Sequence, residues 1–216
     1  MQHKQGFYEK YVKRLVDIVC SLVVLTLFWW LYIILAILVR VKLGSPVLFK
    51  QQRPGKNEKI FSMYKFRTMT DARDEKGNLL PDEIRLTKFG KALRATSLDE
   101  LPEIFNILKG DMSIVGPRPE RVEHVERYKA MIPEFAFREK MKGGLTGYAQ
   151  VYGKYNTTAL DKLKLDLMYI TNYSLLLDVQ IIFETVKILF QKESTEGFSE
   201  AQEMDIHDFN AEHDDH

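Results

Sequence analysis

The feature that most constrains this chain is a run of 22 residues, Ile18 to Val39, without a charged side chain. As a straight helix it would measure about 33 Å at roughly 1.5 Å per residue, enough to cross a hydrocarbon core about 30 Å thick. It exceeds the apolar core of a signal peptide, and Arg40 and Lys42 follow where a small-residue cleavage site would stand. The sequence therefore predicts a retained membrane helix.

Basic residues flank this helix at both ends. The positive-inside rule places such flanks in the cytoplasm, which one straight span cannot do for both of its ends. A re-entrant helix that dips into one leaflet satisfies both flanks, and a single span that obeys the stronger flank is the alternative. We expect re-entrance, with Trp29 and Trp30 as membrane anchors because indole rings prefer the interface. The flanking residues are Lys10, Lys13 and Arg14 before the run, and Arg40, Lys42, Lys50, Arg53, Lys56 and Lys59 after it.

The rest of the chain has the composition of a folded soluble domain. Of 216 residues, 45% are hydrophobic and 28% charged, which excludes a polytopic membrane protein and wholesale disorder. Nine acidic residues and no Lys or Arg fall in 193–216, so the preceding residues are strongly basic and suit anionic partners. We expect a membrane-anchoring segment in 1–44, a compact domain in 45–192 and a flexible acidic tail in 193–216.

A β-hairpin is predicted directly after the membrane helix. Its strands cover Val47 to Arg53 and Ile60 to Met69, joined across Pro54 to Asn57. Because side chains alternate along a strand, Lys65 and Arg67 share one face of the second strand. Such a pair is either a solvated face or part of an anion site.

A helix from about Thr87 to Arg94 carries a basic stripe. Its positive side chains recur every three residues, while Leu86, Phe89 and Leu93 fall on the other side and face a core. The stripe is either solvated or a surface for a diphosphate or an anionic lipid. Its members are Arg85, Lys88, Lys91 and Arg94.

Two adjacent carboxylates, Asp99 and Glu100, open the next helical pattern, which Gly110 ends as a C-terminal cap. Asp99 is a good N-cap residue, with Pro102 in the first turn, where its missing N–H costs least. Adjacent carboxylates repel each other, however, and are tolerable where cations or a metal lie between them and a phosphate. Asp99 is thus either a helix cap or a site carboxylate.

An arginine lies between two prolines, Pro117-Arg118-Pro119. The stiff loop fixes the guanidinium, whose planar fork matches phosphate oxygens two at a time. The alternative is a rigid turn with Arg118 in an internal ion pair.

A glycine-rich stretch, Gly143 to Lys154, offers aromatic and amide groups for a nucleobase or a sugar. It matches neither the dinucleotide fingerprint nor the phosphate loop of nucleotide triphosphatases. Two apolar helical patterns follow, Leu160 to Ile170 and Leu175 to Phe190, the second suited to a membrane surface as well as to a core.

Together these segments resemble the bacterial sugar transferase family, the small monotopic phosphoglycosyl transferases. Eight blocks stand in the family's order and cover about Lys13 to Phe190. They are Lys13-Arg14-x-x-Asp17, Gln52-Arg53-x-Gly55, Tyr64-Lys-Phe-Arg-Thr-Met69, Arg85-x-Thr87-x-x-Gly90-x-x-Leu-Arg94, Ser97-Leu-Asp-Glu-Leu-Pro102, Asn106-x-Leu-Lys-Gly-Asp-Met-Ser113, Val115-Gly-Pro-Arg-Pro119 and Leu145-Thr-Gly-x-Ala-Gln150.

The resemblance implies an α+β, mainly helical protein at the bacterial cell membrane, with its catalytic domain and interfacial amphipathic helices on the cytoplasmic face. It implies transfer of a sugar-1-phosphate from a UDP-sugar to undecaprenyl phosphate, releasing UMP, as the initiating step of exopolysaccharide or capsule synthesis. Asp99 would attack the diphosphate and contact Mg²⁺, and Glu100 would assist the acceptor. The substrate-binding residues would be Lys65, Arg67, Arg85, Arg94, Arg118, Thr146 and Gln150.

The membrane helix departs from the family. The family bends it at a Ser-Pro pair, whereas Trp29-Trp30 stands there and no proline occurs between Met1 and Gly44. Without that proline, either interfacial anchoring makes the helix re-entrant or the helix is straighter than in relatives. Smaller departures are Gly143, where the family often has proline, and Lys154, where it often has arginine.

Rival functions are an inactive membrane scaffold and a UDP-sugar pyrophosphatase that needs no lipid. Nucleic-acid binding is disfavoured, because a membrane helix is present and no aromatic platform lies beside the basic stripe. The sequence leaves open the sugar, the oligomeric state and the role of the tail.

Overall fold

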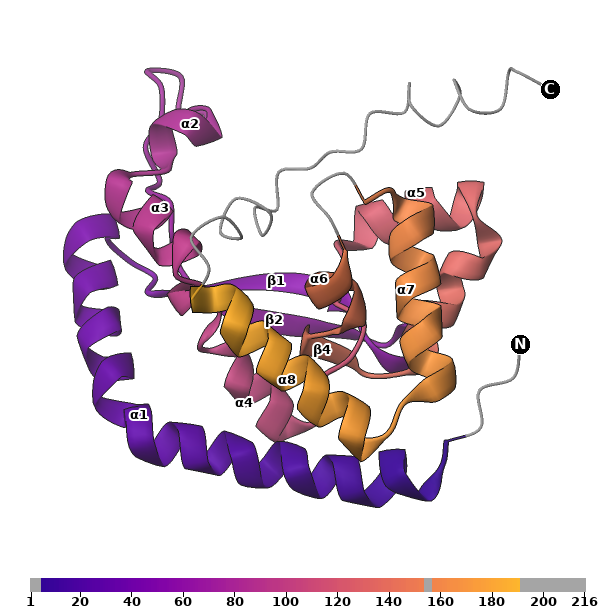
Figure 1. Ribbon diagram of the computed structural model, residues 1–216. Helices are drawn as coiled ribbons and strands as arrows, with labels where there is room; N and C mark the ends of the chain where they lie inside the picture. Colours follow the sequence, from indigo (N-terminus) through magenta and orange to yellow (C-terminus); the bar gives the residue numbers. More distant parts are fainter. Residues whose placement is uncertain (1–4, 154–156, 191–216) are drawn as a thin grey trace.

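The computed structural model describes residues 5–153 and 157–190, so the acidic tail and Lys154 lie outside the described residues. The fold is mainly helical around two short sheets, which confirms the predicted class (Figure 1). In chain order the elements are η1 (Tyr8–Val12), α1 (Lys13–Leu43), β1 (Leu48–Pro54), η2 (Lys56–Glu58), β2 (Ile60–Phe66), α2 (Asp82–Arg85), α3 (Lys88–Ala95), η3 (Leu98–Glu100), α4 (Glu103–Lys109), β3 (Met112–Val115), α5 (Val122–Met131), η4 (Pro133–Lys140), β4 (Gly143–Thr146), α6 (Tyr148–Tyr152), α7 (Ala159–Asn172) and α8 (Leu175–Phe190).

The two sheets differ in strand direction and in the connection between their strands. Strands β1 and β2 form the predicted antiparallel hairpin, with Leu48 opposite Phe66 at its open end. Strands β3 and β4 pair in parallel, with Met112 opposite Gly143, and the helices α5 and η4 lie between them in the chain. Parallel strands need such a crossover, and no local pattern announces the partner, so the sequence did not predict this second sheet.

One buried amide joins α4 to the hairpin. The Asn106 side chain accepts a hydrogen bond from the backbone N–H of Tyr64 (3.0 Å) and donates one to the carbonyl of Ser62 (2.7 Å). Asn106 is fully buried, so both of its polar atoms need partners. The pair of bonds sets the position of α4 along β2 and therefore of the acidic residues that precede it.

Helix α1 is bent, and both of its arms pack against the same body. Figure 1 shows the first arm running beneath the domain and the second rising along its side. In the second arm Leu35, Val39 and Leu43 are buried at intervals of four and pack against Phe66 of β2 and Leu93 of α3. These apolar contacts hold the end of the helix on the hairpin.

The first arm presents a polar face to the body, where Lys13, Asp17 and Ser21 are buried, again at intervals of four. Asp17 accepts hydrogen bonds from the hydroxyl of Ser113 (3.0 Å) and the backbone N–H of Ile114 (2.9 Å) in β3. Lys13 pairs with Asp178 of α8 and bonds the Tyr169 hydroxyl of α7 (2.9 Å). Burying charges is tolerable only with such partners, so this arm is fixed to protein rather than to lipid on that side.

Between the arms, residues 26–30 are exposed on every side of the helix. Trp29 is 61% exposed and Trp30 49%, so both predicted anchors lie outside the body. The indole N–H of Trp30 donates to the carbonyl of Leu27 (3.0 Å). A side chain that takes a main-chain carbonyl competes with the helical ladder, a recognised cause of bending where proline is absent.

The arrangement bears directly on topology. Residues Tyr8–Leu43 form a helix of 36 residues, long and apolar enough by length and composition to cross a membrane. Because both of its ends contact one folded body, a straight span with its ends on opposite sides does not fit this structure. The bent helix agrees with the re-entrant prediction and needs no proline. Helix α8 has the bounds predicted for it and also exposes apolar side chains, Leu176 and Phe183 most strongly.

Re-entrance predicts that both ends of α1 label from one side of the membrane. In a Cys20→Ser background, the single variants Lys10→Cys and Lys42→Cys replace exposed side chains at the two ends. Both should react with a membrane-impermeant maleimide in vesicles of one orientation and neither in the opposite orientation. Trp29→Cys is the control and should be protected in both. Labelling of the two ends from opposite sides would contradict the topology.

Candidate active site

A cavity of about 500 Å³ lies between the hairpin and the helices that follow it. It brings together five of the predicted site residues: Lys65, Arg67, Arg85, Arg94 and Asp99. Lys65 lies in β2, which ends at Phe66, and Arg67 directly follows this strand, which is shorter than predicted. Phe66 lines the cavity as well, so a shared strand face for Lys65 and Arg67 stays a prediction. The other wall is apolar and contains Pro46, Leu48, Phe49, Phe66 and Met69. The cavity therefore joins a cationic wall to an apolar one.

Gly90 allows α3 to pack closely against the segment that follows β2, beside the cavity. A Cβ atom on Gly90 would lie 1.8 Å from the carbonyl oxygen of Thr68, so only glycine permits this approach. The contact places Arg94, one turn further along α3, beside the end of β2, where its Nε donates to the Thr68 hydroxyl (3.1 Å). Arg94 thereby faces the cavity from a fixed position.

Two of the cavity arginines are also committed to the chain. Arg67 donates to the carbonyls of Met69 (2.7 Å) and Ser45 (2.6 Å) and pairs with Asp71. Arg85 donates to the carbonyl of Thr70 (3.0 Å). These bonds fasten the segment after β2 along the cavity, so both arginines shape the site as well as contribute charge to it.

Asp99 does not cap a helix. Helix α4 begins at Glu103 with Pro102 before it, and Asp99 lies in the preceding 3-10 turn, η3. Ser97 precedes this turn with a φ of 53°, a left-handed conformation uncommon outside glycine that reverses the chain after α3. The Asp99 side chain is 6% exposed, and its Oδ1 has no hydrogen-bond partner among the described residues. A buried carboxylate oxygen left without a donor is costly, and such groups are found where function requires them.

The Glu100 carboxylate forms ion pairs with two basic side chains. Lys65 Nζ lies 3.0 Å from its Oε1, and Arg118 approaches both of its oxygens, with 3.3 Å from Nη1 to Oε2. Burial alone would raise the pKa of Glu100, but the charges of Arg118 and Lys65 outweigh it and hold that pKa below its ordinary value. Glu100 is therefore ionised and holds Lys65 and Arg118 in place.

A third carboxyl, Glu103, escaped the sequence analysis. It is fully buried, and its nearer oxygen lies 3.8 Å from Lys65 Nζ. Burial, together with the negative charge of Glu100, raises the pKa of Glu103 to about 8, so it is mostly protonated at neutral pH. Glu103 follows Glu100 by three residues, about one helical turn, and this spacing was the one sign in the sequence that the two could lie together. Acidic residues on an exposed helix face have the same spacing, so the sign was not specific.

The two residues predicted from the glycine-rich stretch do not line the cavity. Thr146 ends β4, and its hydroxyl lies 2.6 Å from that of Thr185 in α8. Gln150, in α6, donates to the carbonyl of Leu145 (3.0 Å), which also accepts a long bond from Arg118 (3.4 Å). Their role in binding substrate stays a prediction.

The residues present suit one magnesium ion held jointly with a diphosphate. No three His, Cys, Asp or Glu side chains form a ligand set in the part of the chain that the structure describes. Mg²⁺ at phosphate sites usually takes one or two carboxylates and completes its shell with water and phosphate oxygens. The carboxylate of Asp99, which lines a cavity with basic side chains, is a suitable ligand of this kind.

Comparison with known proteins agrees with this geometry. The family model described as bacterial sugar transferase matches residues 8–192. The chain belongs to the bacterial sugar transferase family. The match covers both arms of α1, the cavity and the Pro117-Arg118-Pro119 loop.

Individual relatives within the family differ in length and in substrate. The uncharacterized sugar transferase EpsL of Bacillus subtilis is 46% identical over 82% of this chain and 86% of its own. The UDP-glucose:undecaprenyl-phosphate glucose-1-phosphate transferase of Klebsiella pneumoniae is 43% identical over 81% of this chain and 39% of its own. The UDP-N-acetylgalactosamine-undecaprenyl-phosphate N-acetylgalactosaminephosphotransferase of Aeromonas hydrophila is 38% identical over 83% and 44%. The chain thus spans less than half the length of each of these last two transferases.

Removing the Asp99 charge should stabilise the metal-free protein. Burial, with the neighbouring Glu100 charge, raises the pKa of Asp99 to about 6 from a reference value of 3.8. The protonated form therefore stabilises the fold fully below pH 3.8, and this contribution is lost as the pH rises through 6, at a cost of roughly 3 kcal/mol at pH 8. Asp99→Asn should raise Tm by roughly 5 to 10 °C at pH 8 and by little near pH 4.

Thermal unfolding in detergent with a chelator measures this difference. Asp161→Asn is the matched control: hydrogen bonds from Thr158 and Lys164 lower the pKa of this half-exposed carboxylate, so its substitution should not stabilise the protein at pH 8. An Asp99→Asn protein no more stable than the wild type at pH 8 would contradict a buried Asp99 whose pKa is raised.

Proposed function

We propose that the protein transfers a sugar-1-phosphate from a UDP-sugar to undecaprenyl phosphate and releases UMP. The single observation that carries the proposal is Asp99, a buried carboxylate that lines a cavity with five basic side chains and has one oxygen without a hydrogen-bond partner among the described residues. The two relatives named for a reaction use undecaprenyl phosphate and a UDP-sugar. Because their sugars differ, the similarity does not select the sugar for this chain.

In the first step an Asp99 carboxylate oxygen attacks the β-phosphorus of the UDP-sugar. An oxygen–phosphorus bond forms, the bond from this phosphorus to the bridging oxygen breaks, and UMP leaves with the electron pair. In the second step a phosphate oxygen of the acceptor lipid attacks the same phosphorus and releases Asp99. Covalent catalysis of this kind divides one difficult displacement into two.

Neutralising charge is the main task of the site, because a carboxylate is repelled by an anionic diphosphate. Lys65, Arg94 and Arg118 are held on the cavity or directly behind it and would spread the negative charge of the transition state. A bound Mg²⁺ would add to this neutralisation. Glu100 is ionised and already paired with two cations, so we assign it to orientation rather than to proton abstraction.

The apolar wall of the cavity suits the lipid acceptor. Phe66 belongs to this wall and also packs against Leu35, Val39 and Leu43 in the second arm of α1. A polyprenyl chain lying along that arm would reach the cavity with its phosphate towards the cationic wall. The basic flanks of α1 support a location of the body on the cytoplasmic face of the bacterial membrane.

The decisive measurement is UMP release from a panel of UDP-sugars by the purified protein in detergent. We expect sustained release, beyond one UMP per protein molecule, with one or more donors only when undecaprenyl phosphate and Mg²⁺ are both present, and a loss of at least about a thousandfold in Asp99→Asn. Asp161→Asn, at a half-exposed acidic residue in the first turn of α7, should keep full activity.

The alternatives give different results in the same assay. Sustained release of UMP without lipid, beyond one UMP per protein molecule, would indicate a pyrophosphatase, and no release from any donor would favour a scaffold. Intact-mass measurement with UDP-sugar and Mg²⁺ but no lipid tests the intermediate directly. The wild type should gain the mass of one sugar phosphate, and Asp99→Asn should not.

A further inference from the structure

The loop Pro117-Arg118-Pro119 carries the arginine that meets Glu100, yet neither proline has an N–H with which to fix the loop. We propose that Arg53 and Arg138, neither of which lines the large cavity, are positioning residues that hold this loop and so aim Arg118. The proposal rests on the proposed function for its catalytic consequence, but its structural part stands on geometry alone.

Three successive carbonyls of the loop each accept a hydrogen bond from a different element. The backbone N–H of Gly144 in β4 donates to the carbonyl of Pro117 (3.0 Å). Arg138 in η4 donates to the carbonyl of Arg118 (3.0 Å), and Arg53 in β1 donates to that of Pro119 (3.0 Å). Because the two prolines already restrict φ, fixing all three carbonyls leaves the loop little freedom.

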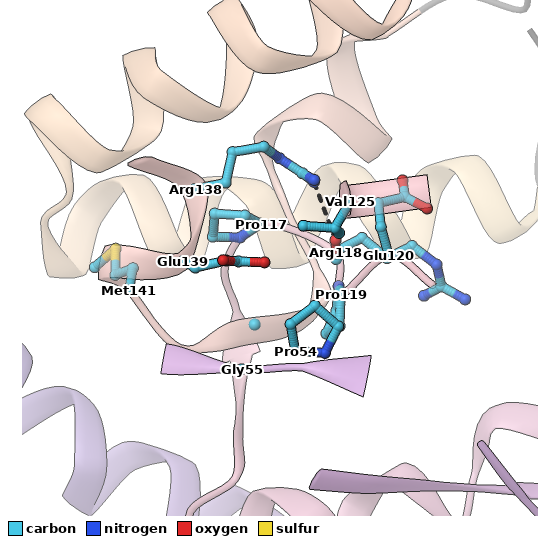
Figure 2. A pocket seen from close by; sticks show the side chains of 11 residues that line it. Pro54, Gly55, Pro117, Arg118, Pro119, Glu120, Val125, Arg138, Glu139 and Met141 are labelled. Carbon is cyan, nitrogen blue, oxygen red and sulfur yellow. Dashed lines mark hydrogen bonds between the residues drawn. The ribbon is translucent and has the colours of Figure 1, made fainter. Parts of the chain in front are cut away.

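Arg138 is itself fixed from behind. It is 4% exposed, and its Nε pairs with Asp166 of α7 at 2.6 Å, where Asp166 is 1% exposed. Figure 2 shows the guanidinium reaching across to the main chain of Arg118. A buried pair of this kind does not in general stabilise a fold more than apolar residues would. Its forked geometry, however, gives it a defined direction, which suits a positioning role.

Arg53 fixes the other end of the loop. It is 4% exposed, and its second terminal nitrogen donates to the Gln51 side chain (2.6 Å). Gly143 lets the Pro119 ring approach, since a Cβ there would lie 2.3 Å from the ring's Cγ.

The space behind the loop has room for packing but not for a ligand. The cavity there measures about 20 Å³, which is about the room one water needs, and it is lined by both prolines, Arg118 and Arg138 (Figure 2). Arg138 therefore has no second substrate to bind at this place, and Arg53 lines neither of the two cavities. Each arginine donates one hydrogen bond to the loop, and the side chain of Arg118 contacts Glu100.

A double-mutant cycle on UMP release tests the proposal. Arg53→Gln should lower kcat about tenfold with little change in KM for the lipid, because a displaced Arg118 stabilises the transition state less. In an Arg118→Ala background the same change should cost less than twofold, since the arginine to be positioned is gone. Equal losses in both backgrounds would overturn the proposal, because a general structural role gives additive effects.

Further variants separate positioning from folding. Arg53→Lys, whose ammonium still offers a donor and a charge, should recover part of the lost kcat. Arg138→Met with Asp166→Leu removes the buried pair without leaving an unpaired charge, and should keep Tm within a few degrees while lowering kcat in an Arg118-dependent way. Arg127→Gln, on the exposed side of α5, is the control and should leave kcat unchanged.

A readout independent of activity keeps the two proposals apart. In the ¹⁵N spectrum of arginine side chains, Glu100→Gln should shift the Arg118 Nε–H signal. Arg53→Gln should also shift this signal, and in the Arg53→Gln background the further change Glu100→Gln should no longer move it. If the wild type releases no UMP but this response is seen, the proposed function fails and the positioning holds. If the Arg118 signal is the same in Arg53→Gln as in the wild type, the positioning fails whatever the activity.

Discussion

The site depends on one ionic contact, in which Glu100 holds Lys65 on one side and Arg118 on the other. This contact joins β2, the turn η3 and the loop after β3, three segments that are not neighbours in the chain. The adjacent Asp99 lines the cavity, and its Oδ1 is buried without a hydrogen-bond partner among the described residues. The surroundings thus set two neighbouring carboxylates apart: Glu100 is ionised and paired with two cations, whereas the pKa of Asp99, the nucleophile that we propose, is raised.

Helix α1, the candidate membrane anchor, also supports this arrangement. Asp17 bonds the N–H of Ile114 in β3, and β3 leads directly into the loop of Arg118. At its other end Leu35, Val39 and Leu43 pack on Phe66, next to Lys65. Helix α1 therefore contacts β2, which carries Lys65, and β3, which leads to Arg118. The packing of its two arms and the geometry of the site thus depend on the same contacts.

Much of this was accessible from local pattern. The hairpin, α3, α7 and α8 follow from alternation and helical periodicity, and Lys65, Arg67, Arg85, Arg94 and Asp99 were predicted as site residues and do line one cavity. The pairing of β3 with β4, the burial of Glu103 and the contacts of Arg138 were not accessible. Each depends on residues distant in the sequence, and a buried Glu or Arg has the same local signature as an exposed one.

The sequence by itself determined the apolar helix, the family and the type of chemistry, because long uncharged runs and ordered motifs are properties of the chain alone. Only the tertiary structure decided that Asp99 is no helix cap, that both arms of α1 lie on one body, and that Glu100 is committed to Lys65 and Arg118. The physical reason is that burial and the distance between charges set a carboxylate's role. Both quantities exist only once the segments have packed.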